Sequence, residues 1–167
     1  ENGAIWAGIE TGGTSIVAEA LLFSAPDDKE AQAAVQKGIG FLLGWLDKKK
    51  MEALTKITYD YRIWGHCLIL QLFCYARARK AAGEHEAAVN EWIPKLVEII
   101  RKEEHKGGGW NYAGAGSACF VTAPVLQSLI VARQHGENVP EELFERGREA
   151  LIKNRLKDGG YYYGPRG

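Results

Sequence analysis

The sequence has no excess of charge of either sign and no long apolar run. Lysine plus arginine and aspartate plus glutamate each number 21 in 167 residues, so the formal net charge is zero. A neutral chain offers no electrostatic footprint for nucleic acid, and we expect no nucleic-acid partner. No apolar stretch approaches the roughly 20 residues that a membrane-spanning helix needs, so we expect no transmembrane segment.

Cysteine is scarce as well, with three residues, and no pair has the C-x-x-C spacing typical of metal or redox sites. Cys67, Cys74 and Cys119 each lie in an apolar run, which favours free thiols in the core over a disulfide or a metal site. Free thiols favour a reducing compartment such as the cytoplasm. We expect neither a metal site nor a cofactor.

What the chain does contain is six segments of helical character, separated by clusters of glycine and proline. The apolar fraction of 46% and the charged fraction of 25% are ordinary for a globular domain of this length. Ser117 is the expected N-cap of the fifth segment, and Pro94 and Pro124 are expected to break or kink the helices that contain them. The expected helices cover residues 14–25, 29–50, 61–80, 84–105, 117–134 and 140–156.

The six segments alternate in character. The first, third and fifth are apolar nearly all round, as fully buried helices are, whereas the second, fourth and sixth each carry one apolar stripe. This alternation predicts a ring or stack of helical hairpins, each with one inner and one outer helix. The stripes are Val35, Ile39, Leu42, Leu43 and Leu46, then Leu96, Val97 and Ile100, and then Leu143, Gly147, Ala150 and Leu151.

A phrase of glycines followed by aromatic residues occurs twice. The sequence GGGWNY at 107–112 returns as DGGYYY at 158–163, which puts Trp110 and Tyr161 51 residues apart. We interpret the phrase as a joint between successive units. Its glycines would adopt positive φ and allow close approach, and Trp110 and Tyr112 would fill the gap where units meet.

Positions on the inner helices repeat at a similar spacing. Leu22, Phe73 and Leu129 are separated by 51 and 56 residues, and a period near fifty indicates a repeat architecture. We therefore expect one repeat region over residues 1–167. Its units cover about residues 11–57, 58–113 and 114–167.

Residues 107–164 resemble the prenyltransferase and squalene-oxidase type repeat of terpenoid cyclases and protein prenyltransferase beta subunits, and residues 11–44 are similar to an earlier unit. The resemblance implies an all-α fold, an α/α toroid of about six hairpins around a central apolar cavity. Three inner and outer pairs are visible here, so we expect an incomplete part of a larger α6/α6 barrel. The remainder of the barrel, or another subunit, would cover its exposed helix edges.

The ligand that this resemblance implies is an isoprenoid or another apolar molecule. The chain has neither the DxDD acid motif of the cyclases nor the DxC zinc motif of the transferases. His66 and Cys67 are adjacent, so on a helix they point about 100° apart and share an ion poorly. We therefore expect a member without visible catalytic motifs, acting as an apolar-ligand-binding or interaction scaffold.

Two enzyme alternatives remain open at this point. The chain is a fragment of an active isoprenoid cyclase or prenyltransferase whose acid or metal motif lies outside this segment, or it is a carbohydrate-active α/α toroid. In the second case, Trp110, Tyr112 and residues 161–163 would stack on sugar rings, but no convincing pair of carboxylates accompanies them. No catalytic residue is assigned.

The candidate ligand-binding residues fall on the inner segments and the turns. Ser15, His66 and Thr122 each precede a repeat position by seven residues, so parallel inner helices would place them at one level of a cavity. The alternative is that Ser15 and Thr122 bond their own backbones and that His66 caps a loop. The complete candidate set is Ser15, Glu19, Tyr59, Asp60, His66, Trp110, Tyr112 and Thr122.

Two further features complete this set. Tyr59 and Asp60 lie nearer the N-terminal rim of the inner helices, where helix N-termini favour anions such as a diphosphate. Glu19 interrupts an apolar stretch, so it faces either the cavity or a missing neighbour, and Gln71 and Gln127 are milder cases.

A second, shorter resemblance concerns residues 7–22, which are similar to the first hairpin of sugar kinases of the actin and hexokinase type. There, an acid before a Gly-Gly-Thr turn cradles a phosphate of ATP between two strands. Glu10, Gly12, Gly13 and Thr14 would take those places. The second strand would contain the sequence Ala-Glu-Ala, which favours a helix.

Overall fold

The computed structural model describes residues 2–47, 60–113 and 116–163. Within these ranges the regular elements are helices, and an isolated β-bridge pairs Arg155 with Tyr161. The predicted all-α class is confirmed. The elements are α1 (Asn2–Ser24), α2 (Lys29–Asp47), α3 (Arg62–Ala78), the short 3₁₀ helix η1 (Gly83–His85), α4 (Glu86–Lys102), α5 (Cys119–Gln134) and α6 (Glu141–Lys153).

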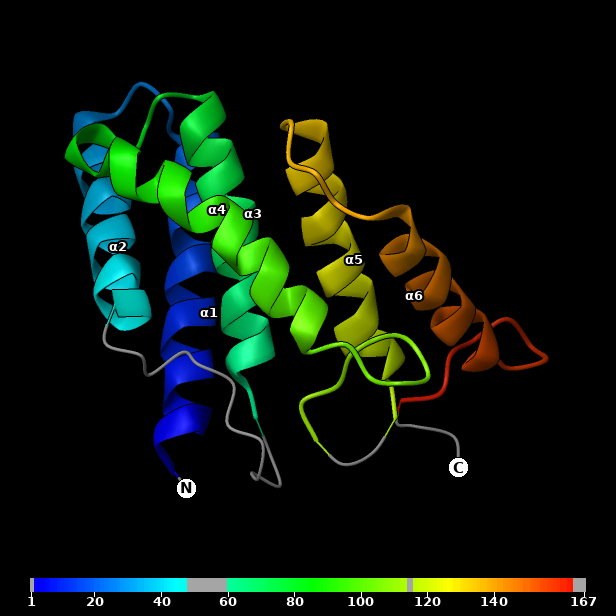
Figure 1. Cartoon of the computed structure of the whole chain (residues 1–167). Coiled ribbons are helices and arrows are strands. Elements are labelled where there is room, and N and C mark those ends of the chain that lie inside the picture. Colours follow the sequence, from blue (N-terminus) through cyan, green and yellow to red (C-terminus); the bar gives the residue numbers. More distant parts are fainter. Residues whose placement is uncertain (1, 48–59, 114–115, 164–167) are drawn as a thin grey trace.

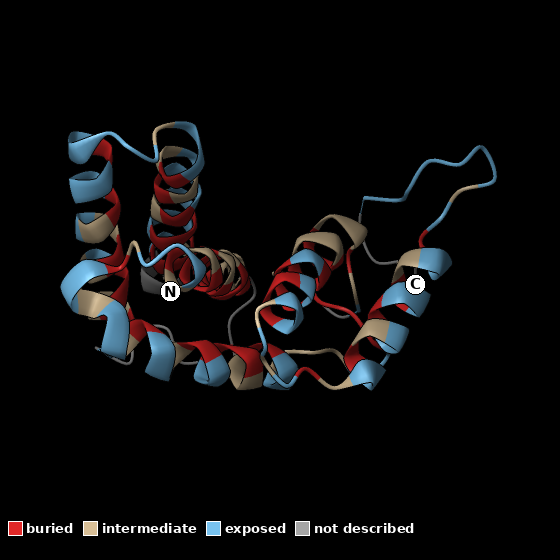
Figure 2. Ribbon diagram, turned by 90° about the horizontal axis from the view of Figure 1, so that it is seen from above, coloured by how far each residue is buried: buried red, intermediate tan, exposed pale blue. Residues whose placement is uncertain are grey.

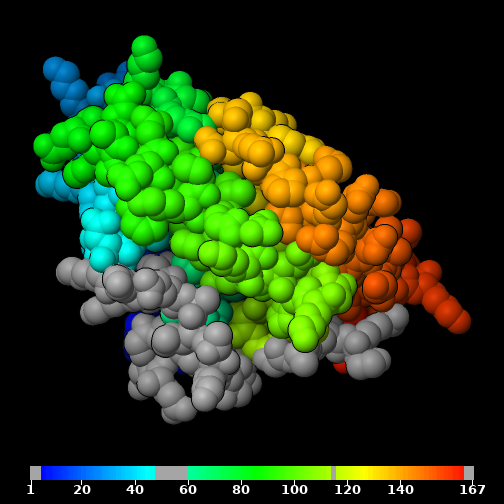
Figure 3. Space-filling model, in the orientation of Figure 1, coloured from blue at the N-terminus to red at the C-terminus, as the bar shows by residue number. Residues whose placement is uncertain are grey.

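The helices α1, α3 and α5 lie side by side and run in the same direction, with their N-terminal ends at the lower edge of Figure 1. Helix α2 packs on α1, α6 packs on α5, and α4 packs across α3 at an angle. In the space-filling view, α4 crosses the front of the molecule between α2 and the pair α5 and α6 (Figure 3). Closure into a toroid and the division into three units stay predictions.

The core lies between the helices, where the predicted stripes of α2, α4 and α6 meet their neighbours. Buried residues, red in Figure 2, lie on the helix sides that face a neighbour. Helix α3 is the centre of the packing, since it contacts α1, α4 and α5, and Ile69, Leu70 and Phe73 on it are fully buried. Every stripe residue named above is buried except Leu151, which is partly buried and packs against the core.

Helix α1 begins at Asn2, well before the predicted start at Thr14, and it runs through Gly12 and Gly13 without interruption. The two-stranded phosphate hairpin considered for this segment is therefore wrong. The glycines serve packing instead. A Cβ atom on Gly8 would lie 2.1 Å from the carbonyl oxygen of Tyr61, and one on Gly12 would lie 3.4 Å from Leu68. Small residues on this side let α1 approach α3 closely.

The prediction that α1 is buried all round is also wrong. One side packs on α2 and α3, and the other faces no neighbour among the described residues. The partner expected to cover this edge, the remainder of a barrel or another subunit, stays a prediction. The large apolar side chains of α1 that are exposed are Trp6, Ile9, Ile16, Val17 and Phe23.

Two predictions about helix ends and prolines need correction. The N-cap of α5 is Ala118, in extended backbone conformation, and no side chain caps it, so Ser117 does not have that role. Helices α4 and α5 continue through Pro94 and Pro124 without a break. A proline removes one helical N–H. At Pro94 the carbonyl that loses its partner belongs to the exposed Asn90, where water can replace the missing donor.

Candidate functional site

The first glycine-aromatic turn is built into the fold. Trp110 is fully buried, and its indole N–H donates to the carbonyl oxygen of Ile100 at 2.8 Å. Its backbone N–H donates to the hydroxyl oxygen of Thr122 at 3.0 Å, and the same hydroxyl donates to the Trp110 carbonyl oxygen at 3.1 Å. These bonds hold α5 against the turn, as the joint interpretation predicted. Because Trp110 is fully buried, it is not accessible to a ligand.

The glycines of this turn have the predicted backbone. Gly108 and Gly109 have φ of 86° and 75°, in the region that favours glycine. A Cβ atom on Gly109 would lie 2.7 Å from the Cβ of Ser117 and 2.8 Å from the hydroxyl oxygen of Thr122. Only glycine therefore allows α5 to sit this close to the turn.

The second turn repeats hydrogen bonds of the first, 51 residues later, although Gly160 lacks the positive φ of its counterpart Gly109. The N–H of His105 donates to the carbonyl oxygen of Gly109 at 3.0 Å, and the N–H of Leu156 donates to that of Gly160 at 2.8 Å. Gly159, the counterpart of Gly108, has φ of 93°. The sequence echo is thus a structural repeat of the turn, although Tyr161 is exposed where Trp110 is buried.

The residues predicted to share one level of a cavity are all fully buried and bonded within the fold. The Ser15 hydroxyl donates to the carbonyl oxygen of Thr11 at 2.7 Å, one turn earlier in the same helix. Nδ1 of His66 lies 3.0 Å from Oε2 of Glu103, which caps the C-terminal end of α4. Thr122 bonds the Trp110 turn and not its own helix, so the own-backbone alternative holds for Ser15 alone.

At the N-terminal rim, Asp60 forms an ion pair with the buried side chain of Arg62. Its carboxylate accepts hydrogen bonds from the backbone N–H of Arg62 at 3.1 Å and from Nε of the same residue at 2.7 Å. The Arg62 side chain is 1% exposed, so Asp60 neutralises a charge that would otherwise be buried without a partner. Tyr59 lies outside the described residues.

Tyr112 belongs to a group of aromatic side chains at this rim, which we call the aromatic rim: Tyr61, Tyr112, Phe120 and Tyr163. Tyr61 stacks on Tyr112 with ring centroids 4.5 Å apart, and Phe120 stacks on Tyr163 at 4.3 Å. The hydroxyl oxygens of Tyr112 and Tyr163 lie 3.2 Å apart, and this hydrogen bond raises the pKa of Tyr112. The rings join the two turns to the starts of α3 and α5.

An open groove runs between α1 and α3, and we call it the α1–α3 groove. Its volume is about 420 Å³. Glu19 lines it, and both of its carboxylate oxygens accept from the amide nitrogen of Gln71, at 2.9 and 3.1 Å. The remaining lining is apolar. The groove is formed by Ile16, Glu19, Ala20 and Phe23 of α1 and by Leu68 and Gln71 of α3.

Sequence reasoning singled out Glu19 and Gln71 but missed Ile16, Phe23 and Leu68. Residues 16, 20 and 23 have the spacing of one helix face. However, α1 is apolar nearly all round, so periodicity alone did not distinguish the open face from the packed ones.

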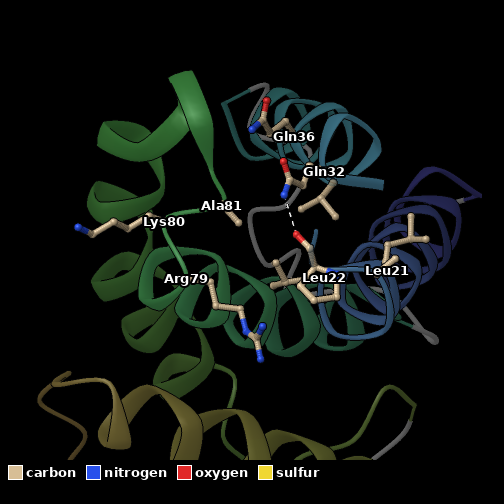
Figure 4. A pocket seen from close by; sticks show the side chains of 10 residues that line it. Leu21, Leu22, Gln32, Gln36, Arg79, Lys80 and Ala81 are labelled. Atoms are coloured by element: carbon tan, nitrogen blue, oxygen red, sulfur yellow. Dashed lines mark hydrogen bonds between the residues drawn. The ribbon is translucent and has the colours of Figure 1, made fainter. Parts of the chain in front are cut away.

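Two other hollows border α1. One, of about 320 Å³, lies where the α1–α2 turn meets the end of α3 (Figure 4). The Gln32 amide closes that turn by donating to the Pro26 carbonyl oxygen at 2.6 Å, and Lys80 points away from the hollow. The other, of about 390 Å³, lies between α1 and α2 and is bordered largely by small side chains such as Ala34 and Gly38.

The thiols of α3 are core residues. Burial raises the pKa of Cys67 and the pKa of Cys74 to about 12 in each case. Cys119, at the start of α5, is only partly buried, and its Sγ donates to the carbonyl oxygen of Tyr162 at 2.8 Å. All three are free, as predicted.

The described ranges contain no cluster of three or more His, Cys, Asp or Glu side chains placed to hold a metal ion. Within the same ranges, no helix combines the length and the apolar character that crossing a bilayer requires.

The described part of the chain is all-α, and an apolar groove lies between two of its helices, α1 and α3. Comparison of the chain with protein-family models, with curated proteins and with solved structures gave no match. The resemblance to the repeats of terpenoid cyclases and prenyltransferases therefore stays a prediction from the residues that carry it.

Proposed function

We propose that this chain is a scaffold of the terpenoid-cyclase and prenyltransferase-like repeat type that binds an apolar, isoprenoid-like ligand in the α1–α3 groove. The observation that carries the proposal is the groove itself. It lies between two of the helices that the repeat interpretation places on the inside, and the side chains of Ile16 and Phe23 are exposed on it.

The energetic case rests on apolar surface that is left uncovered. Ile16 is 56% exposed and Phe23 is 45% exposed, although both lie beside Leu68 in the groove. Covering apolar surface contributes about 2.5 kcal/mol per 100 Å². Immobilising the ligand costs at least about 4 kcal/mol, so the ligand has to be long enough to cover several such areas. An isoprenoid chain has that shape and chemistry.

The polar candidates outside the groove are occupied by contacts within the fold, which argues against a catalytic role for them. His66 is engaged by Glu103, Thr122 by the Trp110 turn, and Asp60 by Arg62. Side chains that hold the fold together in this way are poorly placed to move protons on a substrate.

Isothermal titration calorimetry with farnesol tests the proposal. We expect saturable binding of one ligand per chain with a negative heat-capacity change, the mark of apolar burial. Replacing Ile16 with asparagine should weaken binding about tenfold, because the variant loses apolar contact in the groove.

Ile152 on α6 provides the matched control. It is 55% exposed, against 56% for Ile16, but it does not line the groove. Ile152→Asn should bind farnesol as the unaltered chain does. Equal weakening in the two variants, or no saturable binding by the unaltered chain, would contradict the proposal.

A further inference from the structure

We infer that the α1–α3 groove takes an apolar molecule with a cationic head, of the class of alkyl or isoprenoid amines, whose ammonium group lies against Glu19. This inference rests on the proposed function, since it concerns the same groove. It adds the charge of the ligand and the direction in which the ligand lies.

Among the described residues that line the groove, Glu19 alone has a charged side chain. It is half-buried, and its hydrogen-bond partner is Gln71. The amide satisfies carboxylate lone pairs but is neutral, so it leaves the negative charge uncompensated. Among the described residues, Glu19 takes part in none of the ion pairs.

A ligand in the groove raises the desolvation cost of the Glu19 carboxylate. While the groove is open, water solvates the Glu19 carboxylate. An apolar ligand that covers Ile16 and Leu68 displaces that water, and a neutral ligand then leaves a desolvated charge without a partner. A cationic head removes the penalty by forming a charge-assisted hydrogen bond at the moment when the water leaves.

The surroundings of Glu19 fix the orientation of the ligand. Phe23 and Tyr75 form an edge-to-face pair at 4.9 Å, and the guanidinium of Arg79 lies 4.2 Å from the centre of the Phe23 ring. Burial raises the pKa of Tyr75 and the charge of Glu19 raises it further, consistent with its nearness to the carboxylate. The guanidinium of Arg79 covers one face of the Phe23 ring, so the apolar tail runs from Glu19 towards Ile16 and Leu68.

The test compares farnesylamine with farnesol by isothermal titration calorimetry at neutral pH, where the amine is protonated. The two ligands share one apolar body and differ in the head. We expect the amine to bind roughly tenfold more tightly than the alcohol, the size of one charge-assisted hydrogen bond. Glu19→Gln should remove that difference, because it keeps the shape of the side chain and deletes its charge.

Glu10→Gln is the matched control. Glu10 is exposed on the same helix, outside the groove lining, and its replacement changes the net charge by the same amount. The preference for the amine should persist in this variant. In the unaltered chain, a rise in sodium chloride concentration should weaken binding of the amine and leave binding of the alcohol unchanged.

The outcomes separate this inference from the proposed function. Equal affinity for the two ligands, or a preference for the amine that survives Glu19→Gln, overturns the inference while apolar binding stands. Failure of both ligands to bind overturns the proposed function and the inference with it. Dimerisation that Glu19→Gln and farnesylamine leave unchanged would show that a second copy covers the groove. That result also overturns the inference.

Discussion

At the scale of single residues, Gly8 decides how closely α1 and α3 approach. A Cβ atom there would lie 2.1 Å from the carbonyl oxygen of Tyr61 and 2.2 Å from its carbonyl carbon. These are backbone atoms, which cannot rotate away as the end of a side chain can. Gly13, five residues later in the same helix, has nothing within 4 Å of the corresponding position. A comparison of the two positions therefore separates the effect of close packing, present at Gly8, from the low helix propensity of glycine, which acts at both.

Replacing each glycine with alanine should change stability in opposite directions. Gly8→Ala should lower the free energy of unfolding by about 1–3 kcal/mol, because the added methyl group forces α1 and α3 apart. Gly13→Ala should raise it by about 0.5–1 kcal/mol, since alanine is the better helix former and meets no neighbour. Urea unfolding followed by circular dichroism measures both. Equal effects at the two positions would show that the close approach is not needed.

At the scale of elements, α3 is the most enclosed helix. It lies between α1 and α5 with α4 packed across it, and its cysteines Cys67 and Cys74 face this packing. Their raised pKa, about 12, follows from burial, which disfavours the thiolate. The thiolate is the reactive form, so burial slows the reaction of these thiols in two ways, by blocking access and by raising their pKa.

Thiol labelling should report this enclosure. Because burial raises the pKa of Cys67 and of Cys74 to about 12, both thiols stay protonated at about pH 8, and native protein should react with Ellman's reagent at Cys119 alone. Unfolding in guanidinium should expose all three thiols. Cys119→Ser should abolish the reaction of the native protein. Rapid labelling that survives in that variant would mean that α3 is not enclosed as described.

The elements differ in how far the sequence predicted them. Val35 and Ile39 on α2, and Leu96 on α4, lie in stripes against polar faces, so periodicity alone identified their buried sides. In α1 the same signal is missing, because apolar residues such as Val17 occur on the open face too. Which face stays open depends on the neighbours that are present, and a single segment does not encode that.

The candidate site was predicted in a similarly partial way. Glu19 drew notice as a carboxylate in an apolar stretch, a local signal. Its pairing with Gln71, 52 residues away, depends on how α1 and α3 lie against each other. Conversely, His66 and Thr122 lie on the helices α3 and α5, as expected, but their bonds to Glu103 and to the Trp110 turn are contacts between elements. Sequence spacing alone did not supply those partners.

At the scale of the whole molecule, the helices form an open row with α1 and α2 at one end and α5 and α6 at the other (Figures 1 and 2). An open row leaves apolar surface on its end helix, which accounts for the exposed side of α1. The α1–α3 groove lies beside that surface, and it combines an apolar lining with the single carboxylate of Glu19. We propose that this groove is a ligand-binding site.

The most direct test is a map of backbone amide chemical shifts during titration with farnesol, by NMR. We expect the shifts to concentrate in residues 16–23 of α1 and 68–71 of α3, the segments that contain the lining residues, while the amides of α6 stay unchanged. Shifts confined to the aromatic rim around Tyr112 and Tyr163, or no saturable shifts at all, would contradict the proposal.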